Sequence, residues 1–134
     1  MKICIVVSDY YKEISNNLLE GSIEQLKKNK FKKLKIKFVS GAFEIPNIIS
    51  KNIKKFDAFI ALGCIIKGET DHYYFISNAV STGLMNLSIQ SKKPIGFGIL
   101  TCNNLKQAKV RSSILKKNKG KEVALGIISI LKNK

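Results

Sequence analysis

The chain has 134 residues, of which 45% are hydrophobic and 25% are charged. This length suits one domain with its own core, and the composition excludes an intrinsically disordered chain. The apolar runs are far shorter than a membrane-spanning helix requires, so we predict a single domain over residues 1–134 that does not enter a membrane.

The net charge of +15 suggests a nucleic-acid-binding protein as one interpretation. All but one of the 24 basic residues are lysine, however, and they are spread along the chain without interleaved aromatic residues. Abundant Lys, Ile and Asn are also typical of proteins from AT-rich genomes. We therefore interpret most of the charge as a solvated surface and expect no nucleic-acid partner.

The three cysteines are Cys4, Cys64 and Cys102, and each lies in or just after an apolar run. Their odd number and wide spacing fit neither a disulfide framework nor a zinc site. His72 is the only histidine, which argues against a transition metal held by the protein. We expect reduced thiols in a cytoplasmic protein without a bound metal.

Apolar runs typical of buried strands alternate with segments of helical periodicity. We predict strands over residues 3–7, 34–39, 58–66 and 95–100, and helices over residues 15–30, 43–54, 72–90, 104–115 and 121–131. The alternation indicates an α/β fold, a four-stranded parallel sheet with helices on both faces. Ligands of such sheets bind beyond the carboxyl ends of the strands, which here are followed by residues 8–11, 40–44, 64–72 and 101–104.

Residues 63–72, with the sequence GCIIKGETDH, join the third strand to a long helix. The Thr70 hydroxyl can cap this helix. The free N–H groups of its first turn, together with Gly68, can hold an anion such as phosphate, with Lys67 close by. The alternative is an ordinary strand–turn–helix junction, since threonine is a common capping residue.

His72 lies in the first turn of that helix, at the ligand end of the predicted sheet. An imidazole can accept a proton and return it near neutral pH, which makes His72 the candidate for proton transfer. The alternative is a structural histidine whose nitrogen atoms are satisfied within the fold.

Side chains suited to a heterocyclic ligand follow the first and second strands. Tyr10 offers a flat aromatic face. Glu44, in the sequence GAFEIP of residues 41–46, can accept hydrogen bonds from hydroxyl or amino groups, and Gly41 permits a close backbone approach. The alternatives are a surface tyrosine and an acidic residue that favours the first turn of a helix.

Arg111 is the only arginine in the chain. Its planar guanidinium can bind a phosphate in two places at once, which a lysine ammonium cannot do. We therefore interpret Arg111 as a candidate phosphate ligand, with Lys119, before the last predicted helix, as a second cation.

In this order and spacing, these segments resemble the lumazine synthase family from residue 3 to about residue 131. The specific motifs are GAFEIP at 41–46 and G-x-x-I-K-G-E-T-x-H at 63–72. Weaker matches are PIGFGILT at 94–101, Gln107-Ala108 with Arg111, and NKG at 118–120. The resemblance implies a flavodoxin-like three-layer sandwich. It also implies condensation of 5-amino-6-(D-ribitylamino)uracil with 3,4-dihydroxy-2-butanone 4-phosphate to 6,7-dimethyl-8-ribityllumazine, phosphate and water, without a cofactor.

The resemblance also implies a role for each candidate residue, with His72 as the proton-transfer group. The pyrimidine substrate is bound by Tyr10, Ala42, Phe43, Glu44, Cys64, Ile65, Ile66 and, from a neighbouring subunit, Phe97. The phosphorylated ketone is bound by Glu69, Thr70 and Arg111, and Lys119 lies near the shared site. Family members form pentamers or multiples of pentamers with sites between adjacent subunits, so the implied partners are two small-molecule substrates and further copies of the chain.

Three other functions fit parts of the sequence. A non-catalytic flavin or lumazine carrier would need neither His72 nor Arg111. A nucleic-acid-binding protein would bind DNA or heparin with a steep dependence on salt. A Schiff-base aldolase would require a buried lysine at the end of a strand, for which Lys67 is the only candidate.

Overall fold

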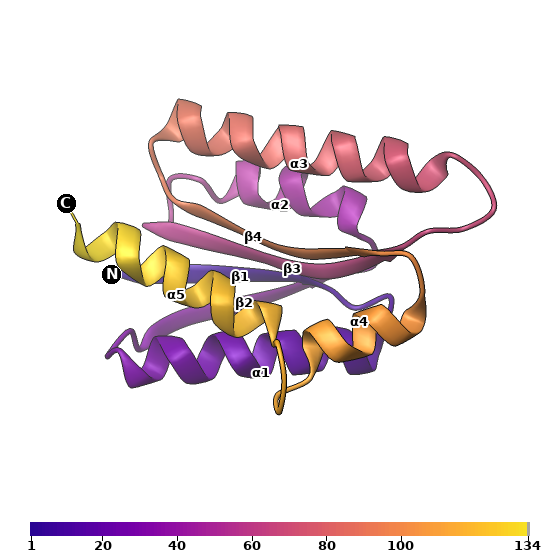
Figure 1. Cartoon of the computed structure of the whole chain (residues 1–134). Helices are drawn as coiled ribbons and strands as arrows, with labels where there is room; N and C mark the ends of the chain where they lie inside the picture. Colours follow the sequence, from indigo (N-terminus) through magenta and orange to yellow (C-terminus); the bar gives the residue numbers. More distant parts are fainter. Residues whose placement is uncertain (134) are drawn as a thin grey trace.

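The computed structural model describes residues 1–133, which form a four-stranded parallel sheet between two layers of helices (Figure 1). The elements in chain order are β1 (Lys2–Ser8), α1 (Lys12–Lys28), β2 (Lys33–Val39), the 3₁₀ turn η1 (Ala42–Glu44), α2 (Ile45–Lys51), β3 (Ala58–Ile66), α3 (His72–Ser91), β4 (Ile95–Cys102), α4 (Leu105–Ser112) and α5 (Lys119–Lys132). The strand order is β2-β1-β3-β4 and every neighbouring pair is parallel. This confirms the predicted flavodoxin-like α/β fold.

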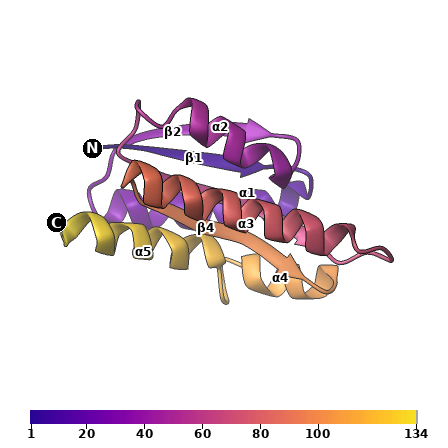
Figure 2. The same ribbon diagram turned by 90° about the horizontal axis from the view of Figure 1, so that it is seen from above.

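Two hydrophobic clusters, one on each face of the sheet, form the core. Successive strand residues point to opposite faces. Ile3, Ile5 and Val7 therefore pack with α1 and α5. Cys4 and Val6 pack on the other face with α2 and α3, which lie side by side over the sheet (Figure 2). The central strands β1 and β3 are buried on both faces, which explains why their sequences are almost continuously apolar.

The surface carries the positive charge. None of the described lysines is buried, including those of the edge strand β2, where lysine alternates with apolar residues. Within residues 1–133, one ion pair forms, between Lys119 and Glu122 at 3.1 Å. No helix in this range combines the length and apolar character needed to cross a membrane.

The predicted helix over residues 43–54 is shorter than expected, and its assigned start at Phe43 is wrong. Phe43 lies in η1, and α2 spans only Ile45–Lys51. Pro46 explains the start, because its fixed backbone and missing N–H favour the first turn of a helix. At the other end, the Asn52 side chain donates a hydrogen bond to the Ile48 carbonyl at 2.8 Å, which helps to close the last turn.

The last helix begins two residues before the predicted Lys121, so Lys119 belongs to a helix and not to a loop. The reason is Asn118, a buried residue whose side-chain oxygen accepts a hydrogen bond from the Lys121 backbone at 2.9 Å. Its amide nitrogen donates to the carbonyls of Asn17 and Ser112, both at 2.8 Å. One side chain thus joins α1, α4 and α5.

Two glycines of α5 offer a matched test of this packing. A Cβ at Gly120 would lie 2.0 Å from the Leu18 carbonyl oxygen of α1, whereas a Cβ at Gly126 would meet nothing within 4 Å. We expect Gly120→Ala to lower the free energy of unfolding by about 2 kcal/mol through overpacking. We expect Gly126→Ala to raise it by about 0.5–1 kcal/mol through helix propensity. Urea denaturation measures both, and a stabilised Gly120→Ala variant would contradict the close approach of the two helices.

Candidate active site

The candidate site lies where the chain order across the sheet reverses. From β1 the chain moves outward to β2 and then crosses back to β3 on the other side of β1. Neighbouring crossovers diverge at such a point and leave a crevice beyond the carboxyl ends of the strands. The segments 8–11 and 64–72, which the sequence analysis nominated, follow β1 and end β3 at this crevice, and parts of both line it.

The strand register leaves a backbone edge available at this crevice. Pairing between β1 and β3 stops at Val7 and Leu62, whereas pairing between β3 and β4 continues to Ile66 and Cys102. In the described part of the chain, the segment from Cys64 to Ile66 therefore has no strand partner on its β1 side. Its peptide groups on that side are suited to hydrogen bonds with the edge of a planar heterocycle.

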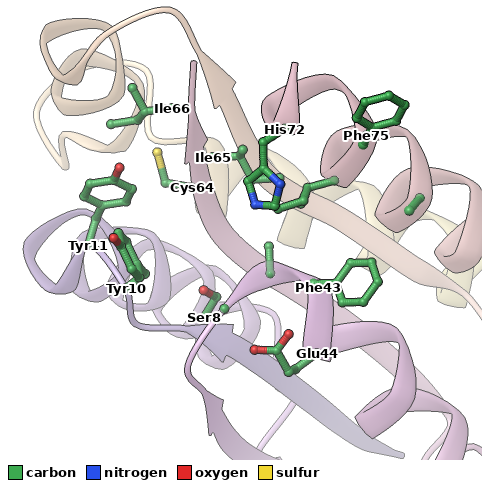
Figure 3. Close-up of a pocket in the computed structure, with 14 residues that line it drawn as sticks. Ser8, Tyr10, Tyr11, Phe43, Glu44, Cys64, Ile65, Ile66, His72 and Phe75 are labelled. Carbon is green, nitrogen blue, oxygen red and sulfur yellow. The ribbon is translucent and has the colours of Figure 1, made fainter. Parts of the chain in front are cut away.

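A cavity of about 830 Å³ occupies the crevice, and we call it the site cavity (Figure 3). Its volume is in the range of small-molecule sites. Its walls come from the β1–α1 loop, η1, the end of β3 and the first turns of α3. The lining residues are Ser8, Tyr10, Tyr11, Gly41, Ala42, Phe43, Glu44, Cys64, Ile65, Ile66, His72, Phe75, Ile76 and Ala79.

Exposed aromatic side chains form the rim of the site cavity. Tyr10 is 73% exposed and its ring meets that of Tyr11 edge to face, with centroids 4.9 Å apart. Phe43 and Phe75 are also exposed, on the opposite side of the opening. Large aromatic groups that a fold leaves in water mark a surface for a ligand or a partner.

Glu44 supplies the carboxylate of the site cavity. It ends the 3₁₀ turn η1, and its Oε1 accepts a hydrogen bond from the Ser40 hydroxyl at 3.1 Å. A Cβ at Gly41 would lie 3.1 Å from this oxygen, so glycine allows the carboxylate to fold back over the turn. Glu44 is among the side chains that line the cavity (Figure 3), and its carboxylate has acceptor positions beyond the one that Ser40 occupies.

His72 is the first residue of α3 and is exposed at the mouth of the site cavity. The Thr70 hydroxyl accepts a hydrogen bond from the His72 backbone N–H at 3.3 Å. The residue at the cap position is Asp71, however, and no side-chain capping bond forms there, so the prediction that Thr70 caps the helix is wrong. Figure 3 shows the imidazole near Ile65, directed toward the space between β3 and η1. An imidazole, a carboxylate and a backbone edge therefore surround one cavity.

Comparison with known proteins assigns the chain to a family. The family model for 6,7-dimethyl-8-ribityllumazine synthase matches residues 1–134. A protein of Buchnera aphidicola subsp. Baizongia pistaciae (strain Bp) that bears the same name is 46% identical over 136 residues. The match covers 96% of this chain and 84% of that relative. The chain belongs to the lumazine synthase family.

Eight of the residues that the sequence nominated line the site cavity together, namely Tyr10, Ala42, Phe43, Glu44, Cys64, Ile65, Ile66 and His72. Five others lie outside its lining. Glu69 and Thr70 are exposed in the segment between β3 and α3. Phe97 is 38% exposed on the edge strand β4, and Lys119 pairs with Glu122 at the start of α5. Their roles in binding stay predictions.

Arg111, the fifth, lies on α4 beside the site cavity and not in its wall. Its Nη1 lies 3.8 Å from the Sγ of Cys102, which neighbours Cys64 of the cavity wall. It lines a second hollow of about 310 Å³ with Asn104, Lys106, Gln107, Val110 and Lys117. Both hollows open at the carboxyl end of the sheet, but contact of Arg111 and His72 with one ligand stays a prediction.

Sequence reasoning missed three cavity residues of α3, namely Phe75, Ile76 and Ala79. Counted from His72 they are three, four and seven positions along the helix, which places all four on one face. This helical spacing from His72 could have identified the three residues as cavity residues from the sequence. Ser8 and Tyr11 fall within residues 8–11, nominated as a ligand-end segment, but neither was chosen as a site residue.

The lysine required by a Schiff-base aldolase does not occur at this strand end. Lys67 is exposed, and its ammonium lies 5.5 Å from the centre of the Tyr74 ring. Its interaction with the Tyr74 side chain raises the pKa of Lys67, whereas an amine that attacks a carbonyl needs a lowered pKa.

Cys64 lines the site cavity but is not poised as a nucleophile. Burial, with a smaller effect of Cys102, raises the pKa of the Cys64 thiol to about 12 from its ordinary 9.0. We expect iodoacetamide to leave Cys64 of the native protein unmodified between about pH 7 and pH 10, since only the thiolate reacts. In the unfolded chain the thiol regains its ordinary pKa of 9.0, so the reaction with iodoacetamide should become faster as the pH rises through that value. Rapid native modification, detected by mass spectrometry of peptides, would contradict this environment.

Proposed function

We propose that the protein condenses 5-amino-6-(D-ribitylamino)uracil with 3,4-dihydroxy-2-butanone 4-phosphate and releases 6,7-dimethyl-8-ribityllumazine, inorganic phosphate and water. The observation that carries this proposal is the site cavity, which brings His72, Glu44 and the free edge of β3 together in a member of the lumazine synthase family. This makes the protein a transferase of riboflavin biosynthesis.

The pyrimidine substrate occupies the site cavity in this proposal. Its ring lies against Tyr10 and bonds to the edge of β3 at Cys64, Ile65 and Ile66. The backbone and side chains of η1, from Ala42 to Glu44, bind the polar groups of the ribityl side. The support is the mixture of exposed aromatic rim, strand edge and carboxylate that surrounds one cavity.

The phosphorylated ketone lies between Gly68 and Arg111. The start of α3 offers N–H groups to the phosphate, Glu69 and Thr70 flank them, and the guanidinium supplies the positive charge. Lys119 adds a further cation near this end. Because phosphate leaves during the reaction, these groups stabilise negative charge that develops on its bridging oxygen.

The chemistry requires several proton movements and no cofactor. The amine of the pyrimidine attacks the ketone, and loss of water gives a Schiff base. Elimination then releases phosphate, and attack of the second amine on the remaining carbonyl, with loss of a second water, closes the ring. His72 accepts and returns the protons of these steps, while alignment of the two substrates supplies much of the remaining acceleration.

We further propose that the enzyme works as a pentamer or a multiple of pentamers in the cytoplasm. Phe75, Met85 and Ile89 leave a row of large apolar side chains exposed along α3, and Phe97 is exposed on the edge strand. A neighbouring subunit that covers α3 would bury this row, and its Phe97 would complete the pyrimidine site. The cysteines are free, as is usual in a reducing compartment.

The test mixes the two substrates with the purified protein and follows the absorbance and fluorescence of the lumazine. We expect one phosphate to be released for each lumazine formed. Light scattering on the same sample should give a mass that is a multiple of five 15.0 kDa chains. Lumazine formation no faster than in the protein-free mixture would refute the proposed activity.

A further inference from the structure

The fold buries the hydroxyl of Ser8, and no described residue forms a hydrogen bond with it. It is the last residue of β1 and is only 1% exposed, yet it lines the site cavity (Figure 3). Its backbone carbonyl accepts a hydrogen bond from the Ser15 hydroxyl. Its own Oγ has no hydrogen-bond partner among the described residues. Buried hydroxyl groups in native proteins are normally bonded, so an unpaired one at a cavity wall points to a ligand.

The strand alternation places this hydroxyl on the same face of the sheet as the catalytic elements. Cys4 and Val6 of β1 pack with α2 and α3, and Ser8 is the next residue of that alternating series. Glu44 and His72 belong to the elements that cover this face. The Ser8 hydroxyl therefore lies on the side of the cavity that holds the carboxylate.

Gly63 keeps the space beside Ser8 open. A Cβ at Gly63 would lie 3.0 Å from the Cβ of Ser8 and 3.7 Å from its Oγ. Any larger side chain on this part of β3 would cover the hydroxyl. With glycine there, no side chain from this position of β3 covers the Ser8 Oγ, which lies just beneath the cavity wall with almost no exposed surface.

The two polar side chains on this face differ in what they can bond. The Glu44 carboxylate only accepts hydrogen bonds, whereas the Ser8 hydroxyl both donates and accepts. A chain of alcohol groups matches this pair, because one hydroxyl can donate to Glu44 while another exchanges a hydrogen bond with Ser8. The flat ring is better matched by the free edge of β3 at Cys64–Ile66 and by the aromatic rim.

We propose that the Ser8 hydroxyl binds a hydroxyl of the substrate's ribityl chain and helps the site to select pyrimidines that carry this chain. The proposal rests on the proposed function, since it assigns one more contact to the same substrate. Ser8 takes no part in the proton transfers and acts on binding alone.

The test compares the affinities of two ligands by fluorescence titration. One is 6,7-dimethyl-8-ribityllumazine, and the other is 6,7,8-trimethyllumazine, which has the same ring with a methyl group in place of the ribityl chain. We expect Ser8→Ala to weaken binding of the ribityl ligand about fivefold, as the loss of one neutral hydrogen bond should. The affinity for the methyl ligand should stay the same.

Ser77→Ala is the matched control. Ser77 lies on α3 outside the site cavity, and its Oγ also has no partner among the described residues. This variant should bind both ligands like the unmodified protein. An unchanged affinity of Ser8→Ala for the ribityl ligand, or an equal loss for both ligands, would overturn the proposal. Failure of the proposed function is a separate result, in which the unmodified protein binds the ribityl ligand but forms none from the two substrates.

Discussion

Replacing His72 with alanine is expected to slow lumazine formation by about a hundredfold, at the lower end of what general acid–base catalysis contributes. The imidazole is exposed at the mouth of the site cavity and packs against little of the core, so its removal should leave the fold unchanged. Stopped-flow absorbance under saturating substrates measures the rate. Binding of the lumazine product, measured by fluorescence, should change less than threefold because the ring and the ribityl chain keep their contacts.

The ratio of these two effects identifies the role of His72. A proton-transfer residue affects the rate and spares the affinity for product. Equal losses of rate and affinity would show that His72 only shapes the cavity and would contradict its catalytic role. His72→Asn is a useful companion variant, because an amide keeps hydrogen bonding but cannot exchange a proton near neutral pH.

Replacing Arg111 with alanine is expected to raise the KM for the phosphorylated ketone about 30-fold, as the loss of a charge-assisted hydrogen bond should. The KM for the pyrimidine should change little, because the ring binds in the neighbouring site cavity. Initial rates measured while each substrate is varied in turn separate the two constants.

The second hollow provides a matched control for Arg111. Lys117 lines the same hollow and carries the same charge, but it lacks the planar fork that grips a phosphate. Lys117→Ala should change the KM for the ketone less than threefold. Comparable losses in both variants would indicate a general effect of positive charge, and an unchanged KM in Arg111→Ala would exclude the phosphate contact.

The fold could be predicted because its central strands have to be apolar on both faces. For this reason Ile3–Val7 and the segment that starts at Ala58 are continuous runs of apolar residues. The helices between the strands instead show apolar residues at helical spacing. The order of the strands could not be obtained from periodicity, which contains no information on pairing. The structure supplies this order, and the register adds that β3 extends beyond the end of β1.

The errors at element boundaries have local causes. Helical spacing through Ile45, Ile48 and Ile49 extends back to Phe43, but Pro46 places the first α-helical turn later. At the C-terminal end of the chain, apolar spacing begins after Lys121, whereas Asn118 sets the start of α5 through bonds to three elements. Periodicity reports the buried face of a helix, and capping decides where the helix begins.

The candidate site was predicted in position but not in detail. The rule that ligands bind at the carboxyl ends of parallel strands nominated residues 8–11 and 64–72, and parts of both segments line the site cavity. The role that we propose for Ser8 could not be predicted, because it depends on the closeness of Gly63, which is 55 positions further along the chain. The position of Arg111 outside the wall of the site cavity likewise depends on how α4 packs beside Cys102.

The most direct test of the account is a crystal structure of the assembled protein with 6,7-dimethyl-8-ribityllumazine and inorganic phosphate bound. We expect the lumazine in the site cavity and the phosphate within about 3 Å of both the Arg111 guanidinium and the N–H groups at the start of α3. His72 should lie between the two ligands. A phosphate bound away from Arg111, or a lumazine bound away from His72, would contradict the claim that these two residues act on one pair of substrates.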